Sequence, residues 1–277
     1  MLTPIHITRG ISILEIPPIR NKSKIRILAE DGSVYKINKQ LTSKNHPYRK
    51  INEVLCCYLL HIWNLKTPNI ASLNTPPSIL NGSSKLPPAF RSYLNKSDQA
   101  IGIKIHEQHC TFSLLGDDPH YWSYKALASP LDLIKISLWD GWIGNNGRQN
   151  TSKDIFFGID KNQKLDIFTY NHGLTFGDIP YAFLSRNYRN KSHFSLLNLD
   201  LSKKIVRMIT DRDLIQFLSE YYRQAIDTSL FALPQIFQYI NPIIPVSKEA
   251  RSNIEDFLKN KDRNQRVFEE FASIITK

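Results

Sequence analysis

The sequence predicts an α+β fold in which a β-rich N-terminal part with one helix precedes a mostly helical C-terminal part. Two observations carry this prediction. Apolar and polar residues alternate over much of residues 4–40, which is typical of strands with one buried face. From about residue 126 onward, helical patterns dominate apart from one short pair of strands. We place the boundary near residues 90–100 and divide the chain into residues 1–95 and 96–277.

The composition is that of a globular protein with a substantial core. Of 277 residues, 42% are hydrophobic and 22% are charged, which excludes a disordered, collagen-like or coiled-coil chain. No apolar stretch approaches the roughly 20 residues of a membrane span, and the first residues lack the pattern of a secretory signal. The three cysteines do not form a disulfide framework, so we expect reduced core residues in a cytoplasmic protein that does not enter membranes.

The N-terminal part contains one strong hairpin signal and one helix. Residues 24–30 and 33–39 alternate apolar and polar side chains on either side of Asp31-Gly32, a dipeptide typical of tight β-turns. Apolar residues recur at helical spacing over residues 50–65, which predicts a helix there. Several prolines follow, and we expect residues 73–88 to form a loop or irregular connection.

The C-terminal part is predicted to contain three helices and a pair of strands. The expected elements are a helix over 126–144, strands over 154–158 and 165–170, and helices over 211–232 and 247–275. The last two helices open at Asp211 and Ser247, which are residue types that cap helix N-termini.

Four short patterns of polar and charged residues lie near the ends of these elements, in a fixed order. They are Lys36 on the strand after the Asp31-Gly32 turn, Asn52-Glu53 at the start of the first helix, DGWIGNNGR at residues 140–148, and YNHGLTF at residues 170–176. Together they resemble the motifs of short, single-chain HipA-like kinases, over roughly residues 10–275. The resemblance implies a bilobal protein-kinase-like fold, with a β-rich N-lobe holding one helix and a mostly helical C-lobe.

The resemblance also implies ATP and Mg²⁺ as cofactors. Lys36 would contact the nucleotide phosphates, with Glu53 as its partner, and Asp154 and Asn171 would bind the metal. Asn38 is a second candidate for the position of the lysine, because side chains two residues apart on a strand share a face.

The chain departs from the family pattern at the positions that carry the chemistry. Gly147 stands where the family has its catalytic Asp, and glycine can neither orient a hydroxyl group nor accept its proton. Asp154 stands where the family has a metal-binding Asn, after an apparent two-residue insertion, and Asn171 stands where it has the metal-binding Asp. One carboxylate and one amide therefore remain, and both supply oxygen ligands of the kind that Mg²⁺ prefers.

The other candidates of this region are Asp140, Asn145 and Arg148. We expect Arg148 to organise the loop, and Asp140, Asn145 or Asp166 is available as a substitute base. Each candidate also has a structural interpretation: a lysine on a strand is often an exposed cation, Glu53 suits a helix N-terminus, and Asp and Asn favour turns.

These observations favour a degenerate kinase, or pseudokinase, that binds a nucleotide and acts through protein partners. Some relatives in the family belong to toxin-antitoxin systems. The first alternative is an active Ser/Thr-type protein kinase that transfers the γ-phosphate of ATP with relocated catalytic groups. The second is a basic nucleic-acid-binding module on a kinase-like fold, because the net charge is +11.

Overall fold

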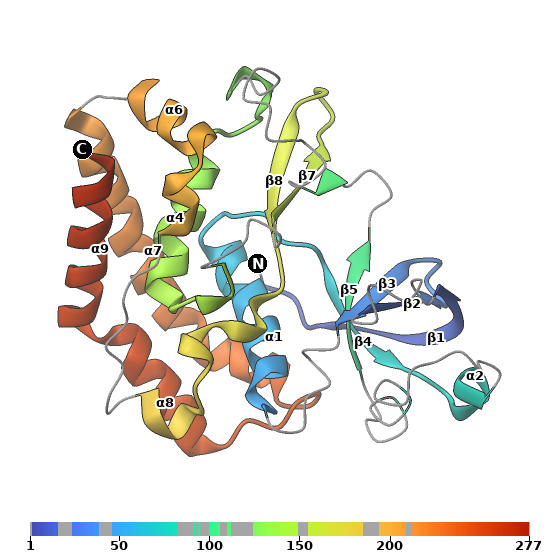
Figure 1. Cartoon of the computed structure of the whole chain (residues 1–277). Helices are drawn as coiled ribbons and strands as arrows, with labels where there is room; N and C mark the ends of the chain where they lie inside the picture. The colour runs from blue at the N-terminus through green and yellow to red at the C-terminus, as the bar shows by residue number, and fades with distance from the viewer. Residues whose placement is uncertain are drawn as a thin grey trace.

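Most of the helices lie to one side of the barrel formed by the first strands, while the pair of β7 (Ile155–Ile159) and β8 (Leu165–Thr169) lies near α4 (Leu131–Ile143) and the short helix α2 (Pro77–Asn81) lies beside the barrel (Figure 1). The computed structural model describes residues 2–15, 24–38, 46–81, 91, 94, 100–105, 110–111, 124–148, 155–184, 194–208 and 212–276. Within them, the strands from the first part of the chain form one body, and most of the helices pack together beside it.

The strand-rich body is a closed barrel. Its strands are β1 (His6–Glu15), β2 (Lys24–Ala29), β3 (Val34–Asn38), β4 (Ile70–Asn74) and β5 (Ala100–Ile105), in the order β1-β2-β3-β5-β4. Parallel pairing of β4 with β1 closes it. The predicted hairpin is confirmed: Leu28 pairs with Val34 across the turn, where Gly32 has a φ of 73°. The division of the chain at residue 95 stays a prediction.

The alternation of side chains along β3 decides which of them point into the barrel and which point outward. Tyr35 and Ile37 are buried in the barrel core beside Ile25 and Ile27. Because neighbouring side chains on a strand point to opposite faces, Lys36 projects from the outer surface of the barrel.

The helical body has a second core, and the first helix belongs to it. Its helices are α1 (Tyr48–Ile62), α4 (Leu131–Ile143), α6 (Asp200–Met208), α7 (Arg212–Ile240), α8 (Lys248–Lys259) and α9 (Lys261–Ile275). Trp63, directly after α1, stacks on Trp142 with ring centroids 5.0 Å apart and donates its indole N–H to Ser229 Oγ at 3.2 Å. The first helix is therefore anchored in the helical body.

The remaining elements are short. They are α2 (Pro77–Asn81), the strands β6 (Cys110–Thr111), β7 (Ile155–Ile159) and β8 (Leu165–Thr169), and the 3₁₀ helices η3 (Tyr124–Ala126), η4 (Asn146–Arg148), η6 (His172–Leu174), η7 (Phe176–Asp178), η8 (Tyr181–Phe183) and η9 (Ser195–Asn198). The antiparallel pair of β7 and β8 confirms the predicted strand pair.

Several predicted boundaries are wrong. The helix expected over 126–144 begins only at Leu131, and the helix expected to end at residue 232 continues through Pro234 to Ile240. The single helix expected over 247–275 is two helices that meet at Asn260. The connection expected over 73–88 contains the end of β4 and the helix α2.

The cap at Ser247 and the state of two cysteines agree with the expectations from the sequence. Ser247 caps α8 by accepting a hydrogen bond from the N–H of Ala250. Asp211, the other predicted helix cap, lies outside the residues that the structure describes. Cys56 and Cys57 are buried and free. No helix in the described part of the chain has the length and apolar character needed to cross a membrane.

Candidate functional site

Lys36 lies where the barrel meets the β7–β8 hairpin. Its ammonium group is 4.8 Å from the ring centroid of Tyr170, the residue that follows β8, within the range of a cation–π contact. The Tyr170 ring also packs against Phe156, with centroids 5.3 Å apart. Phe156 and Tyr170 form a small buried cluster with Ile103 of the barrel. Lys36 is therefore held at the junction between the two bodies.

Glu53 and Asn171 meet at the same junction. The Glu53 side chain is fully buried, and its Oε1 accepts a hydrogen bond from the backbone N–H of Asn171 at 3.1 Å. Asn171 has a φ of 64°, a left-handed conformation that Asn tolerates better than most residues. Because Asn171 follows Tyr170 directly, the structure brings Lys36, Glu53 and Asn171 together.

Two of the predicted ligand residues cannot be placed with them. The backbone of Asn38 ends β3, two residues beyond Lys36, while its side chain is not among those described. Asp154 lies outside the described residues altogether.

A second residue of α1 fixes the loop after Asn171. Asn52 is fully buried, and its amide N–H groups donate to the carbonyls of Gly173 at 3.0 Å and Thr175 at 3.1 Å. The amide oxygen accepts from the hydroxyl of Tyr181 at 2.6 Å. The amide nitrogen thus holds the backbone of η6 and of the segment after it, and the amide oxygen holds the side chain of Tyr181 in η8.

An ion pair reinforces the same contact. Arg49 donates from Nε to Asp178 Oδ1 at 2.9 Å and from Nη2 to Oδ2 at 2.6 Å, which is a bidentate arrangement. The Tyr48 hydroxyl donates to the Asp178 carbonyl at 2.9 Å. These partners of the loop were not predicted from the sequence, although residues 48, 49 and 52 share one face of the helix, a spacing that indicates a common partner.

The loop after α4 is organised by a buried ion pair. Arg148 donates from Nε to Asp140 Oδ2 at 2.7 Å and from Nη2 to Oδ1 at 2.8 Å, and both residues are almost wholly buried. The Asn145 amide donates to the same Oδ1 at 2.8 Å, and its own oxygen accepts from the Gly147 N–H at 3.0 Å. This geometry makes Asp140 and Asn145 supports of the loop.

The third candidate base is also engaged. Asp166 forms an ion pair with Lys66. Around Gly147, a Cβ atom would lie 3.1 Å from Asn145 Oδ1 and 3.5 Å from Leu174 Cβ. Among the described residues, the three side chains considered as replacements for the missing carboxylate are therefore already bonded to neighbours.

His172 is a structural residue of the loop. It is fully buried, and its ring lies edge-on to Trp139 with centroids 5.2 Å apart. Burial, with the neighbouring charge of Arg148, holds the pKa of His172 well below its ordinary value of 6.5. The imidazole is therefore neutral at pH 7.

Comparison with known proteins supports the fold at a coarse level. No family model matches the sequence. No curated protein matches it either. Among solved structures, the chain is similar to the crystal structure of a Helicobacter pylori proinflammatory kinase, CtkA, with a TM-score of 0.51, 12% identity, and coverage of 97% of this chain and 99% of that chain. At this identity the likeness shows the fold alone, and it confirms that this chain has an α+β, kinase-like fold.

Proposed function

We propose that this chain is a HipA-like, kinase-fold protein that binds ATP with Mg²⁺ between the barrel and the helical body. In this proposal it transfers phosphate slowly or not at all and acts through a protein partner. The observation that carries the proposal is the convergence of Lys36, Glu53 and Asn171 at one junction, from three separate segments of a kinase-like fold.

The residues at the junction fit the chemistry of a nucleotide. Lys36 supplies a cation for the phosphates, and Asn171, together with Asp154, would supply amide and carboxylate oxygens for Mg²⁺. The bound metal would neutralise negative charge on the phosphates. Glu53 contributes by holding the backbone of Asn171, and through it the position of the amide.

Weak or absent phosphoryl transfer follows from Gly147. A positioned general base contributes on the order of 10²–10⁴-fold to a proton-transfer step, and glycine provides none. The ion pairs of Asp140 and Asp166 support the same view, because each of these carboxylates is already engaged by Arg148 or Lys66.

A thermal-shift titration tests nucleotide binding. We expect millimolar ATP or ADP with Mg²⁺ to raise the Tm, because a ligand at about 100 times its Kd stabilises the folded state by about 2.7 kcal/mol. Lys36→Met should abolish most of this shift, whereas the matched control Lys261→Met, on an exposed position of α9, should keep it. Absence of a shift in the unaltered protein at millimolar nucleotide would refute the proposal.

Incubation with radiolabelled Mg-ATP separates a pseudokinase from an active kinase. We expect no incorporated phosphate above that of a denatured control. Phosphate incorporation that Asp154→Ala abolishes would instead support the Ser/Thr-type kinase. Retention on DNA or RNA with a steep salt dependence, in a protein that ignores nucleotides, would support the nucleic-acid-binding module.

A further inference from the structure

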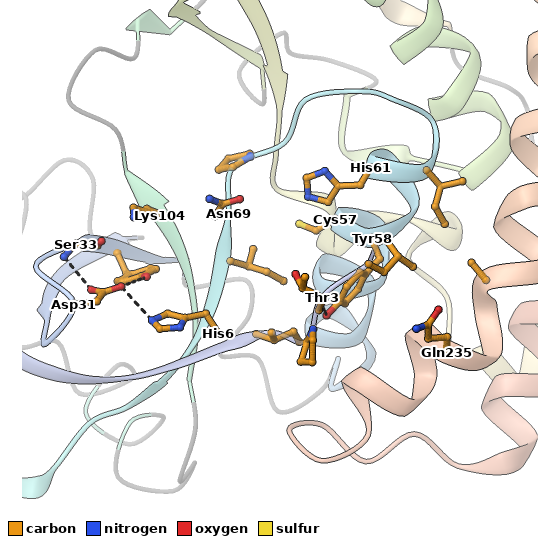
Figure 2. Close-up of a pocket in the computed structure, with 18 of the residues that line it drawn as sticks. Thr3, His6, Asp31, Ser33, Cys57, Tyr58, His61, Asn69, Lys104 and Gln235 are labelled. Atoms are coloured by element: carbon orange, nitrogen blue, oxygen red, sulfur yellow. Dashed lines mark hydrogen bonds and ion pairs between the residues drawn. The ribbon is translucent and has the colours of Figure 1, made fainter.

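A hollow lies between the barrel and the helical body, beside α1 (Figure 2). Its volume is about 950 Å³, near the upper end of the range typical of small-molecule sites. Its walls come from the N-terminal segment, the β2–β3 turn, α1, the ends of β4 and β5, and α7.

This hollow is separate from the junction at Lys36. Four residues of α1 line it, Cys57, Tyr58, His61 and Ile62, and none of the residues that line it is Lys36, Glu53 or Asn171. At 100° per residue, Tyr58 and Ile62 face away from Glu53 on the helix surface. A ligand could therefore occupy it without contacting the proposed nucleotide site.

The barrel wall of the hollow is polar, but its carboxylate is already satisfied. Asp31 Oδ1 accepts from the Ser33 N–H at 2.9 Å, and Oδ2 accepts from the Tyr35 hydroxyl at 2.7 Å. His6 Nε2 lies 3.3 Å from the same Oδ2. Asp31 is the one acidic side chain among the described residues that line the hollow, so little acceptor capacity faces a ligand.

The same wall offers donors. Lys104 at the end of β5 lies beside Asn69, whose carbonyl accepts the Lys104 N–H at 2.8 Å. Among the described residues, no carboxylate lies within ion-pair distance of the Lys104 ammonium. Figure 2 shows Lys104 and Asn69 at the same end of the hollow. The charge of Lys104 also acts on Asp31, the carboxylate of this wall, so an anionic group would lie on the side of Lys104 towards Asn69.

The opposite wall mixes apolar and polar side chains. Tyr58, Ile62 and Ala232 give it apolar surface, and the Tyr58 hydroxyl donates to the Thr3 carbonyl at 2.9 Å. Its polar side chains are His61, Thr228 and Gln235. His61 adds no charge at neutral pH, because burial lowers its pKa. A flat apolar group would find contact surface here and no competing charge.

We propose that this hollow is a second ligand site, which binds a small organic anion with an aromatic ring system. The anionic group lies at Lys104 and Asn69, and the ring lies against Tyr58 and Ala232. The proposal does not depend on nucleotide binding, because Lys36, Glu53 and Asn171 are not among the residues that line this hollow.

The test uses anilinonaphthalene sulfonate, an aromatic anion whose fluorescence rises in apolar surroundings, as the probe. We expect saturable binding to the folded full chain. Lys104→Gln should weaken it about tenfold, the effect of losing one charge-assisted contact. Ala232→Trp, which fills the hollow from a partly exposed position of α7, should abolish it. Lys261→Gln is the matched charge control and should bind like the unaltered protein.

Two further measurements make the outcome decisive. Near-UV circular dichroism must show that each variant is folded, because the probe also binds loosened proteins. Titration with Mg-ATP and the probe together should show no displacement, even if the nucleotide proposal holds. Displacement of the probe by Mg-ATP would overturn the assignment of this site. So would Ala232→Trp and Lys104→Gln variants that bind the probe as tightly as the unaltered protein.

Discussion

At Gly147 the backbone itself does not exclude a side chain. The residue is not among those with a positive φ, and a Cβ atom would approach Asn145 Oδ1 to 3.1 Å, a contact that a small shift relieves. We therefore predict that Gly147→Asp folds, with a loss of stability of about 1 kcal/mol from local crowding.

Phosphate incorporation from Mg-ATP then shows whether a carboxylate at position 147 is what phosphoryl transfer lacks in this chain. If the remainder of the site is competent, Gly147→Asp should raise incorporation by about 10²–10⁴-fold over the unaltered chain. Gly147→Asn is the matched control, because it has the same shape and no proton-accepting carboxylate. Equal rates in the two variants would contradict the role assigned to position 147.

His172 predicts a pH dependence of stability. Its pKa is well below 6.5 in the folded protein, chiefly because of burial, and returns to about 6.5 on unfolding. Between these values the unfolded chain binds a proton that the folded chain does not. The free energy of unfolding should therefore fall as the pH drops below about 6.5, by at most about 1.4 kcal/mol per pH unit.

Urea unfolding at a series of pH values measures this effect. His172→Gln should flatten the dependence between pH 7 and pH 5, because the substitution removes the titrating group. His61→Gln serves as the comparison, since the pKa of His61 is also lowered by burial but its ring is more exposed. An unchanged slope in His172→Gln would show that other groups control acid unfolding.

Individual residues differ in how far the sequence reveals them. Lys36, Glu53 and Asn171 were predicted as one group from local motifs; in the structure Lys36 contacts Tyr170, the residue before Asn171, and Glu53 accepts from the Asn171 N–H. Tyr170 and Asp178 were not predicted as site residues, because their roles come from contacts with Lys36 and Arg49, far away in the sequence. A motif identifies residues with chemical function more readily than the side chains that support them.

At the scale of elements, α1 is fastened to the segment from η6 to η7 by Arg49, Asn52 and Glu53. We predict that the Arg49–Asp178 pair has a coupling energy of about 1–3 kcal/mol, because it is bidentate and largely removed from solvent. A double-mutant cycle of Arg49→Met and Asp178→Asn, read by urea unfolding, measures it. Additive effects of the two substitutions would mean that the pair does not hold the helix.

The elements themselves were predictable where local chemistry decides them. Asp31-Gly32 identified the β2–β3 hairpin, and apolar spacing identified α1. The strand β4 was missed because prolines surround it and its partners, β1 and β5, are distant in sequence. The break at Asn260 had a visible signal, since Asn is a good N-cap and its side chain accepts from the Arg263 N–H.

Tertiary packing overrode local propensity in α7. Pro234 predicts a helix end, yet the helix continues to Ile240. Leu233, Ile236 and Phe237 are buried in the helical core, and their burial outweighs the lost hydrogen bond at the proline. Only the packed structure supplies this information.

On the scale of the whole molecule, the two larger hydrophobic cores predict two units of stability, which meet where Ile101 and Ile103 of β5 join the helical core and the Phe156–Tyr170 cluster. Ile27 belongs to the barrel core, and Leu59 of α1 belongs to the core of the helical body. Truncation of either to Ala should cost about 2–5 kcal/mol locally. Because cooperative units open separately when few buried apolar contacts join them, the two losses should appear in different segments of the chain.

Hydrogen exchange followed by mass spectrometry distinguishes the units. Ile27→Ala should speed exchange in β1–β5 and leave α7 and α9 near their original rates. Leu59→Ala should speed exchange in α1, α7 and the segment from η6 to η7, because Glu53 and Asn52 would loosen with the helix. Uniform acceleration of all segments in both variants would instead mean one cooperative unit. In the two-unit case, the Lys36 side of the junction and its Glu53 side belong to different units, so a ligand that bridges them should slow exchange in both.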